Sequence, residues 1–325
     1  MPGYDTHFVF GEVAFKQIKA SSVKSIIANN HDHYTLGLFG PDIFFYSIPE
    51  SLSSGPNAGS VIHTQNVNLF FRNMFRFATA QPNEERMQKA LAYFCGFLAH
   101  YSLDRYCHPF VYARTGYNPN LPKKDNNLDL HFALETDIDI LLLDRYLKET
   151  PKSFKKKSRI NITYAEIELI SEMLQFAINQ TYDQFSNSRF SIKAAILSIK
   201  SEQRLIKSCP DIVRYYVEQA ENKVIGRHYI SALIPGNGVI STSDPFNDRH
   251  DIWTNPWKSD EIHTESFPML MDKAKSKVLE LYDLLEDAII ECPDPAEYSA
   301  FSSAAEDFLS AIGNYSYHSN LDVNV

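Results

Sequence analysis

The sequence is poor in the residues that mark several classes of protein. It has 12 Gly among 325 residues, which is few for a sheet-rich fold with many tight turns. Its longest uninterrupted apolar stretch, 90–99 apart from one glycine, is far shorter than the ~20 residues that span a bilayer. The four cysteines form no CxxC pair. Neither a zinc ribbon nor a disulfide framework is therefore indicated, and we expect mostly buried free thiols.

The chain also lacks a surplus of positive charge. It has 31 Lys and Arg against 40 Asp and Glu, a net charge of -9 with its 11 His taken as neutral. A basic surface is the usual mark of a non-specific nucleic-acid or anionic-membrane binder, so we expect no stable nucleic-acid complex. The start, MPGYDTHFVFGEVAF, shows no secretory signal. These features predict a soluble, cytoplasmic protein without a transmembrane segment.

Apolar residues recur at helical spacing along most of the chain, and 44% of the residues are hydrophobic. This pattern predicts an all-α fold with a substantial core, and strand signals are scarce. The expected helices cover about 8–27, 61–79, 83–107, 127–149, 164–186, 190–208, 210–233, 264–291 and 296–313.

Two irregular stretches interrupt the helical pattern. Residues 115–127 are rich in Asn, Pro and Lys and predict an exposed loop. Residues 235–261 form a long expected loop that contains Trp253 and Trp257. This loop would either close over a cleft as a lid or cap the helices with its aromatic side chains. The second interpretation is favoured, because Trp more often packs than takes part in chemistry.

One segment, GFLAHYSLDRYCHPF, carries a regular set of polar residues. His100, Asp104 and His108 stand at i, i+4 and i+8, which places them on one narrow stripe of a helix. Downstream, HFALE contains His131 and Glu135 at i, i+4. Two side chains at this spacing can bind one zinc ion, as in the helical HExxH motif.

Each of these pairs alone is more often a structural hydrogen bond than a metal site. Five such residues between 100 and 135, on otherwise apolar helices, favour metal binding. Unpaired polar groups would be costly there, whereas zinc would neutralise the carboxylates and bind the imidazoles together. Three upstream residues, each more often structural when taken singly, are further candidates: His7, Asp42 and His63.

Taken in order, these eight residues resemble the ligand set of the bacterial zinc-dependent phospholipase C family, relatives of the S1/P1 nucleases. The segment DPFNDRHDIWTNPW…HTESF is similar to cytoplasmic members of that family. The resemblance implies a multi-helix, phospholipase C/P1 nuclease-like fold around a trinuclear zinc cleft. We expect one all-helical domain over 1–325, with the metal site in about 1–150 and a helical C-terminal extension over about 160–325.

The resemblance also divides the ligands among the ions. The first zinc would be held by Asp42, His63, His100 and Asp104. The second would be held by His108, His131 and Glu135. The third would be held by His7 and a bridging Asp104. The exported relatives complete the third site with an N-terminal Trp, which this chain lacks, so that two or three ions are expected.

The resemblance implies hydrolysis of a phosphodiester, most simply a phospholipid. In the corresponding mechanism, water beside the bridging Asp104 attacks phosphorus, and Asp42 orients or deprotonates that water. Relatives that act on choline lipids carry aromatic residues at positions that are Ile43 and Ser60 here. A choline-binding aromatic box is therefore not expected, although Phe44, Phe45 and Tyr46 offer another apolar wall.

Two alternatives stay open. The first is a nuclease of the S1/P1 type, but those enzymes carry Gly before the bridging Asp and a His-Gln-Pro-Leu-His run after it, where this chain has SLDRYCHPF. The second is a non-catalytic, zinc-stabilised helical protein that binds a phosphorylated ligand or a partner. Natural headgroup and oligomeric state are not determined by the sequence.

The remaining polar residues near these motifs carry no metal-ligand spacing. Asp137 and Asp139 point to other faces of their helix and are expected to be solvated or to support the ligands from outside. Four other histidines are assigned to the surface or to satisfied core positions: His31, His33, His228 and His318.

Overall fold

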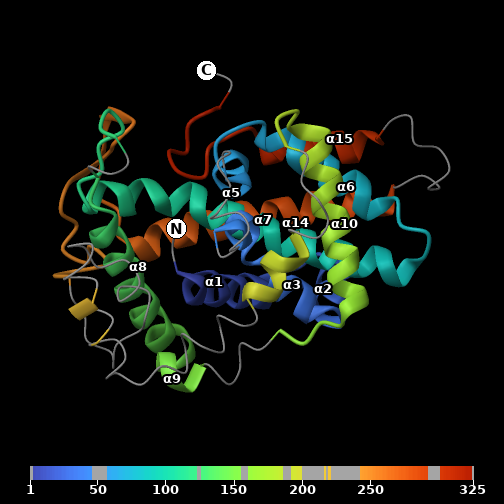
Figure 1. Ribbon diagram of the computed structural model, residues 1–325, viewed down its shortest axis with the longest axis horizontal. Helices are drawn as coiled ribbons and strands as arrows, with labels where there is room; N and C mark the ends of the chain where they lie inside the picture. The colour runs from blue at the N-terminus through green and yellow to red at the C-terminus, as the bar shows by residue number, and fades with distance from the viewer. Residues whose placement is uncertain are drawn as a thin grey trace.

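The computed structural model describes residues 3–45, 57–122, 126–154, 160–185, 192–199, 216, 219–220, 242–291 and 301–323. Helices make up most of this part of the chain, and two short strands are the exception (Figure 1). The all-α prediction is confirmed. Within the same ranges, no helix is both long enough and apolar enough to span a membrane.

The helices follow one another in chain order around a long central helix. They are α1 (Tyr4–Gln17), α2 (Ser21–Asn29), α3 (His31–Gly37), η1 (Gly40–Phe44), α5 (Ala58–Ile62), α6 (Val67–Thr79), α7 (Glu84–Arg114), α8 (Leu128–Leu142), η3 (Leu143–Leu147), α9 (Pro151–Phe154), α10 (Tyr164–Thr181), α14 (Phe267–Ile290) and α15 (Ser303–Ile312). The strands are β1 (Trp253–Asn255) and β2 (Lys258–His263).

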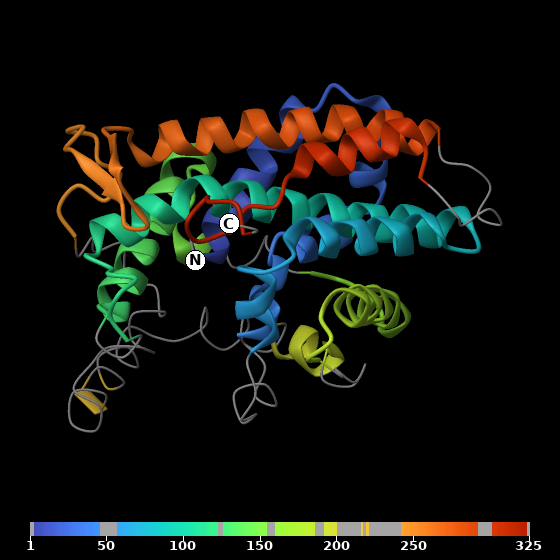
Figure 2. The same ribbon diagram turned by 90° about the horizontal axis from the view of Figure 1, so that it is seen from above.

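Helix α7 is the axis of the fold, and α14 runs along it (Figure 2). Its N-terminus is capped by the Asn83 side chain, which accepts a hydrogen bond from the Arg86 N–H at 3.0 Å. The helix continues seven residues beyond the predicted end at 107, through Pro109 to Arg114. A proline inside a helix removes one backbone hydrogen bond. Burial of the neighbouring Phe110 offsets that loss.

Helices α3 and α7 touch through their backbones. A Cβ atom on Gly96 would lie 2.1 Å from the carbonyl oxygen of Tyr34, and one on Gly37 would lie 2.2 Å from that of Tyr93. Any side chain at either position would push the helices apart, because real Cβ atoms do not approach oxygen so closely. This contact brings the end of α3 against the middle of α7, where the predicted metal ligands lie.

The single helix predicted over 8–27 is wrong, because the chain forms α1 and α2 with a break at Ile18. The N-terminus of α2 is capped from a distance by Glu286 of α14. Its carboxylate accepts hydrogen bonds from the backbone N–H groups of Ser22 (2.9 Å) and Val23 (3.0 Å). A capping group 263 residues away leaves no local signal in the sequence.

Other predicted helices agree in type and differ at their ends. The segment 61–79 divides into α5 and α6 at Asn66, whose φ of 47° is incompatible with a continuous helix. The structure has α8 and η3 within 127–149, α10 within 164–186, α14 within 264–291 and α15 within 296–313. Of the helices predicted over 190–208 and 210–233, residues 192–199 are helical, and most of the rest lies outside the described residues.

The loop predicted over 235–261 is partly wrong, because β1 and β2 pair there as an antiparallel hairpin. Trp253 faces His263 across the hairpin and packs edge-on against Phe110 of α7, with ring centroids 5.5 Å apart. Its indole N–H donates to the carbonyl of Glu265 at 3.1 Å. Trp253 thus anchors the hairpin on α7 as an aromatic cap. Residues 235–241 lie outside the described part of the chain.

Candidate metal centre

Seven of the eight predicted ligands form two compact groups of buried side chains. The first group, called group A, consists of Asp42, His63, His100 and Asp104. The second, group B, consists of His108, His131 and Glu135. Within each group, the ligand atoms all lie within 4.8 Å of one another. This spread is small enough for one ion to reach every member of a group.

The two groups meet on α7, which carries two residues of group A and one of group B. Asp42 reaches group A from η1, where the turn depends on Gly40. That glycine has a φ of 52°, and a Cβ atom on it would lie 2.3 Å from the His100 ring. Only glycine therefore permits this turn to lie against the His100 ring. The other group B ligands come from α8.

Three of the imidazoles are held in one tautomer by backbone carbonyl groups. The Nδ1 atom of each ring lies within hydrogen-bond distance of a backbone carbonyl oxygen. The pairs are His63 with Gly59 (2.6 Å), His100 with Leu38 (2.9 Å) and His108 with Tyr317 (2.9 Å). A carbonyl oxygen only accepts, so Nδ1 carries the proton in each ring. The lone pair of the neutral ring is then on Nε2, ready for a metal ion, and the carbonyl fixes the orientation of the ring.

The Nε2 atoms of group A face carboxylate oxygens. His100 Nε2 lies 3.0 Å from Asp104 Oδ2, and His63 Nε2 lies 3.3 Å from Asp42 Oδ1. Within the described ranges these four atoms are buried and make no hydrogen bond. A lone pair facing a carboxylate at this distance is repulsive unless a cation or a proton lies between them. Zinc suits this set of imidazole and carboxylate ligands, so the residues fit the ion that the sequence predicts.

His7 comes close to group A but is not one of its four members. Its Nε2 lies 3.2 Å from Asp104 Oδ1, and its ring stacks on His100 with centroids 4.1 Å apart. The preceding residue, Thr6, is fixed by Asp139 of α8, which accepts hydrogen bonds from the Thr6 N–H (2.7 Å) and hydroxyl (2.6 Å). Asp139 therefore supports His7 from outside. His7 and Asp104, the two residues to which the sequence assigns a third ion, thus lie side by side in the described part of the chain, which begins at residue 3.

The electrostatics of the two groups differ. Burial opposes a charge on His63, but the nearby Asp104 and Asp42 carboxylates outweigh it and raise the pKa of His63 to about 9. Burial lowers the pKa of His131 and, more strongly, that of His108. Burial also opposes the charge of Asp104, but the attraction of His108, His100 and His7 holds its pKa well below the usual range. At neutral pH, metal-free group A holds a proton on His63, whereas both imidazoles of group B are neutral.

Zinc binding to the metal-free protein should therefore release protons at pH 7. The ion must displace the proton from His63, so the apparent zinc affinity of group A should rise by up to about tenfold per pH unit until the pH reaches about 9. The imidazoles of group B require no such displacement. Calorimetric zinc titration in buffers of different ionisation enthalpy would count the protons released. An affinity that is independent of pH between 7 and 9 would contradict this assignment.

A family model described as zinc-dependent phospholipase C matches residues 6–192. This range covers more than half of the chain and includes all eight predicted ligands. The chain belongs to this family. No curated protein and no solved structure matches it. The family assignment and the two metal-compatible groups agree, although the family model ends well before the C-terminal helices.

One residue beside the two metal-compatible groups of this zinc-dependent phospholipase C family member was not predicted from the sequence. His318, expected at the surface or in a satisfied core position, lies next to both groups. Its ring stacks on His63 (centroids 5.0 Å apart, planes at 9°) and lies 5.4 Å from the ring of His108. No spacing in the sequence connects His318 with the predicted ligands, because a loop far along the chain brings it there.

Aromatic side chains border group B. The ring of Tyr112 lies 4.7 Å from that of His131, and Trp257 of the hairpin packs edge-on against Tyr112 at 5.0 Å. Near group A, Phe45 is 38% exposed, and its ring lies 5.6 Å from that of His63. Ile43 and Phe44 are both buried, while Tyr46 lies outside the described residues. Phe45, and not Ile43, therefore offers an exposed apolar surface beside group A.

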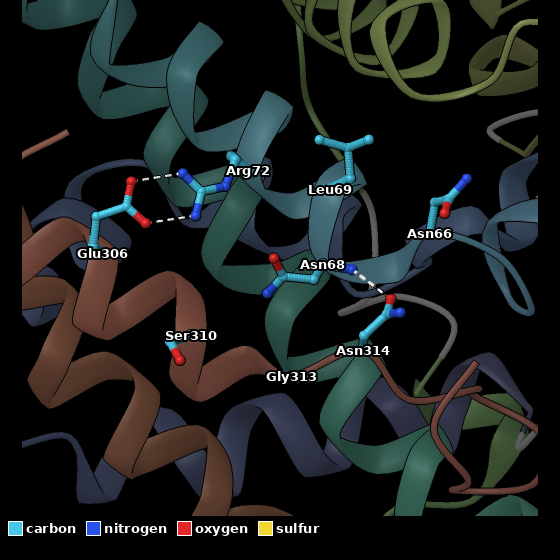
Figure 3. Close-up of a pocket in the computed structure, with 8 residues that line it drawn as sticks. All are labelled: Asn66, Asn68, Leu69, Arg72, Glu306, Ser310, Gly313 and Asn314. Carbon is cyan, nitrogen blue, oxygen red and sulfur yellow. Dashed lines mark hydrogen bonds and ion pairs between the residues drawn. The ribbon is translucent and has the colours of Figure 1, made fainter. Parts of the chain in front are cut away.

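A polar hollow of about 530 Å³ lies between α6 and the end of α15 (Figure 3). Its only arginine, Arg72, is paired with Glu306 through hydrogen bonds of 2.7 and 2.5 Å. None of the residues that line it belongs to group A or group B. This hollow is therefore separate from the metal centre.

Proposed function

We propose that the chain is a zinc-dependent phosphodiester hydrolase of the phospholipase C type. One observation supports this most directly: in group A, buried imidazole Nε2 atoms lie directly opposite carboxylate oxygens. Such an arrangement needs a cation or a proton between the facing atoms, and the set of imidazole and carboxylate ligands suits zinc. Group B adds a second set of ligands, with His108 on the next turn of the same helix and His131 and Glu135 on α8. Two adjacent ion sites are typical of enzymes that cleave phosphoric esters.

The residues would divide the work as follows. Group A would hold one zinc and group B a second, with His7 and Asp104 contributing to a third. When bound, zinc supplies Lewis acidity that polarises a phosphoryl oxygen and lowers the pKa of water. Asp42 would accept the proton of the attacking water. Asp104, whose oxygens face His7 on one side and His100 on the other, would hold the ligands of neighbouring ions together.

The substrate class follows from charge and from the walls of the site. With a net charge of -9 the chain offers no general attraction for a polyanion, so a small phosphodiester or a phospholipid headgroup fits better than a nucleic acid. Phe45 gives the open side of group A an apolar contact. Ile43 and Ser60 leave no aromatic box for choline. We therefore propose a phospholipid or related phosphodiester with a headgroup other than choline.

The test is hydrolysis of a generic phosphodiester, bis(p-nitrophenyl) phosphate, by the purified protein. We expect turnover that falls to the uncatalysed background after dialysis against a chelator and returns on addition of zinc. Vesicles of phosphatidylcholine and of phosphatidylethanolamine would then report headgroup choice. A protein that holds two or three zinc ions per chain and cleaves none of these substrates would instead be a non-catalytic, zinc-stabilised binding protein.

A further inference from the structure

The C-terminal segment 314–323 is a built loop that lies across α7 (Figure 2). It closes on itself through hydrogen bonds from Val323 N to Asn314 O and from Ser316 N to Leu321 O, both 2.9 Å. The guanidinium of Arg105, on α7, lies 3.7 Å from the centroid of the Tyr315 ring. The loop is thus closed by its own hydrogen bonds, and Arg105 holds it on α7 through the cation–π contact and a hydrogen bond to Asn320.

Tyr317 ties this loop to both metal groups through its backbone. Its N–H donates to the carbonyl of His63 at 3.0 Å, and its carbonyl accepts from His108 Nδ1 at 2.9 Å. The side chain of Tyr317 is fully buried, with its ring 4.8 Å from that of Tyr101. The residue that follows Tyr317 is therefore held at a fixed place between group A and group B.

That residue is His318. Its ring lies next to both His63 of group A and His108 of group B, at centroid distances of 5.0 and 5.4 Å. It differs from the members of both groups in burial, because they are buried whereas His318 is partly exposed. A ligand that enters from solvent and spans the two groups would meet this ring.

The nitrogen Nδ1 of His318 lies 3.2 Å from the hydroxyl oxygen of Tyr112. When that hydroxyl donates to Nδ1, the neutral ring carries its proton on Nε2 and becomes a hydrogen-bond donor there. We propose that His318 is a phosphate-contacting residue whose Nε2–H donates to a non-bridging phosphoryl oxygen of a substrate held between group A and group B. This inference rests on the proposed function. It also assigns part of the site to a segment beyond the family-matched residues 6–192.

The experiment compares phosphate binding by zinc-loaded variants of the full chain. His318→Phe keeps a ring between His63 and His108 but has no donor, and His318→Gln keeps an N–H at a similar reach. His263→Phe is the matched control, because His263 also stacks on an aromatic ring, that of Trp253 at 4.4 Å, but belongs to neither metal group. Calorimetry with inorganic phosphate gives the dissociation constant, and elemental analysis gives the zinc content.

We expect His318→Phe to weaken phosphate binding by about 10- to 100-fold, the effect of one hydrogen bond to a charged acceptor. The zinc content should stay at that of the wild type. His318→Gln should recover most of the affinity, and His263→Phe should bind as the wild type does. For bis(p-nitrophenyl) phosphate, His318→Phe should lower kcat/KM at least as strongly as it weakens phosphate binding, because the same contact forms with the substrate.

Three results would overturn the inference. The first is unchanged phosphate affinity in His318→Phe. The second is loss of zinc from that variant, which would make His318 a metal ligand. The third is a zinc-loaded wild type that does not bind phosphate. If the wild type binds phosphate in a His318-dependent manner yet hydrolyses no phosphodiester, the proposed function fails while the phosphate contact stands.

Discussion

Replacing Asp104 with Asn is expected to remove zinc from group A and to lower phosphodiesterase activity by at least about 1,000-fold. The carboxylate of Asp104 is the meeting point of the centre, since His7 Nε2 lies 3.2 Å from Oδ1 and His100 Nε2 lies 3.0 Å from Oδ2. An amide has the same shape but no charge, so it binds zinc far more weakly.

The same substitution should leave the metal-free protein folded. The NH₂ group of the introduced amide would donate to an imidazole lone pair, and this hydrogen bond would replace the attraction between the carboxylate and the neighbouring imidazoles. The melting temperature of the chelator-treated variant should therefore lie close to that of the treated wild type. Elemental analysis, activity and thermal unfolding are the measurements. Asp283→Asn, which neutralises an exposed carboxylate on α14, is the control and should change none of them.

An Asp104→Asn variant that keeps both its full zinc content and its activity would show that group A is not the metal site. A variant that unfolds even without metal would show that Asp104 has a structural role instead. The two outcomes are separated by thermal unfolding of the metal-free proteins.

Replacing His131 with Ala is expected to remove one zinc ion and to leave group A loaded. His131 Nε2 lies 2.7 Å from Glu135 Oε1, and its ring stacks near that of His108 with centroids 6.2 Å apart. Without His131, group B retains one imidazole and one carboxylate, too few to hold zinc tightly. Activity should fall by about 100- to 1,000-fold, because the substrate loses an electrophilic contact while the other ion site remains.

Two measurements on the His131→Ala protein test this prediction: its zinc content by elemental analysis and its rate of phosphodiester hydrolysis. His31→Ala is the control, because His31 pairs with Glu12 at the surface and lies outside both groups. If His131→Ala loses every zinc ion, the two groups are not independent sites. If it loses none, Glu135 and His108 bind the ion without it, and the division of ligands is wrong.

The local part of the site was predictable from the sequence. The i, i+4, i+8 spacing of His100, Asp104 and His108 places them on one face of any helix, and α7 keeps that face through Pro109. The pair on α8 follows from the same rule. Asp42 and His63 carried no such local signal and were predicted through the family resemblance. The structure brings both against α7.

Errors in the fold prediction arose where distant residues decide a local conformation. The break between α1 and α2 is stabilised by Glu286, which binds the free N–H groups at the start of α2. The hairpin of β1 and β2 is held by packing of Trp253 on Phe110. In both cases one partner of the contact lies far along the chain from the break or the hairpin. The residues next to the break or the hairpin therefore do not predict the local conformation.

The sequence by itself determined the chemistry of this protein, because residue type and helical spacing together specify buried imidazole and carboxylate ligands for zinc. Only the tertiary structure decided which atoms of those residues face the proposed ion sites. The carbonyl groups of Gly59, Leu38 and Tyr317 select the Nε2 lone pairs. The last two carbonyls come from segments distant from their imidazoles, and the loop that carries Tyr317 also brings His318 to the centre. Hydrogen-bond partners contributed by remote backbone have no periodicity in the chain, so their positions become apparent only in the fold.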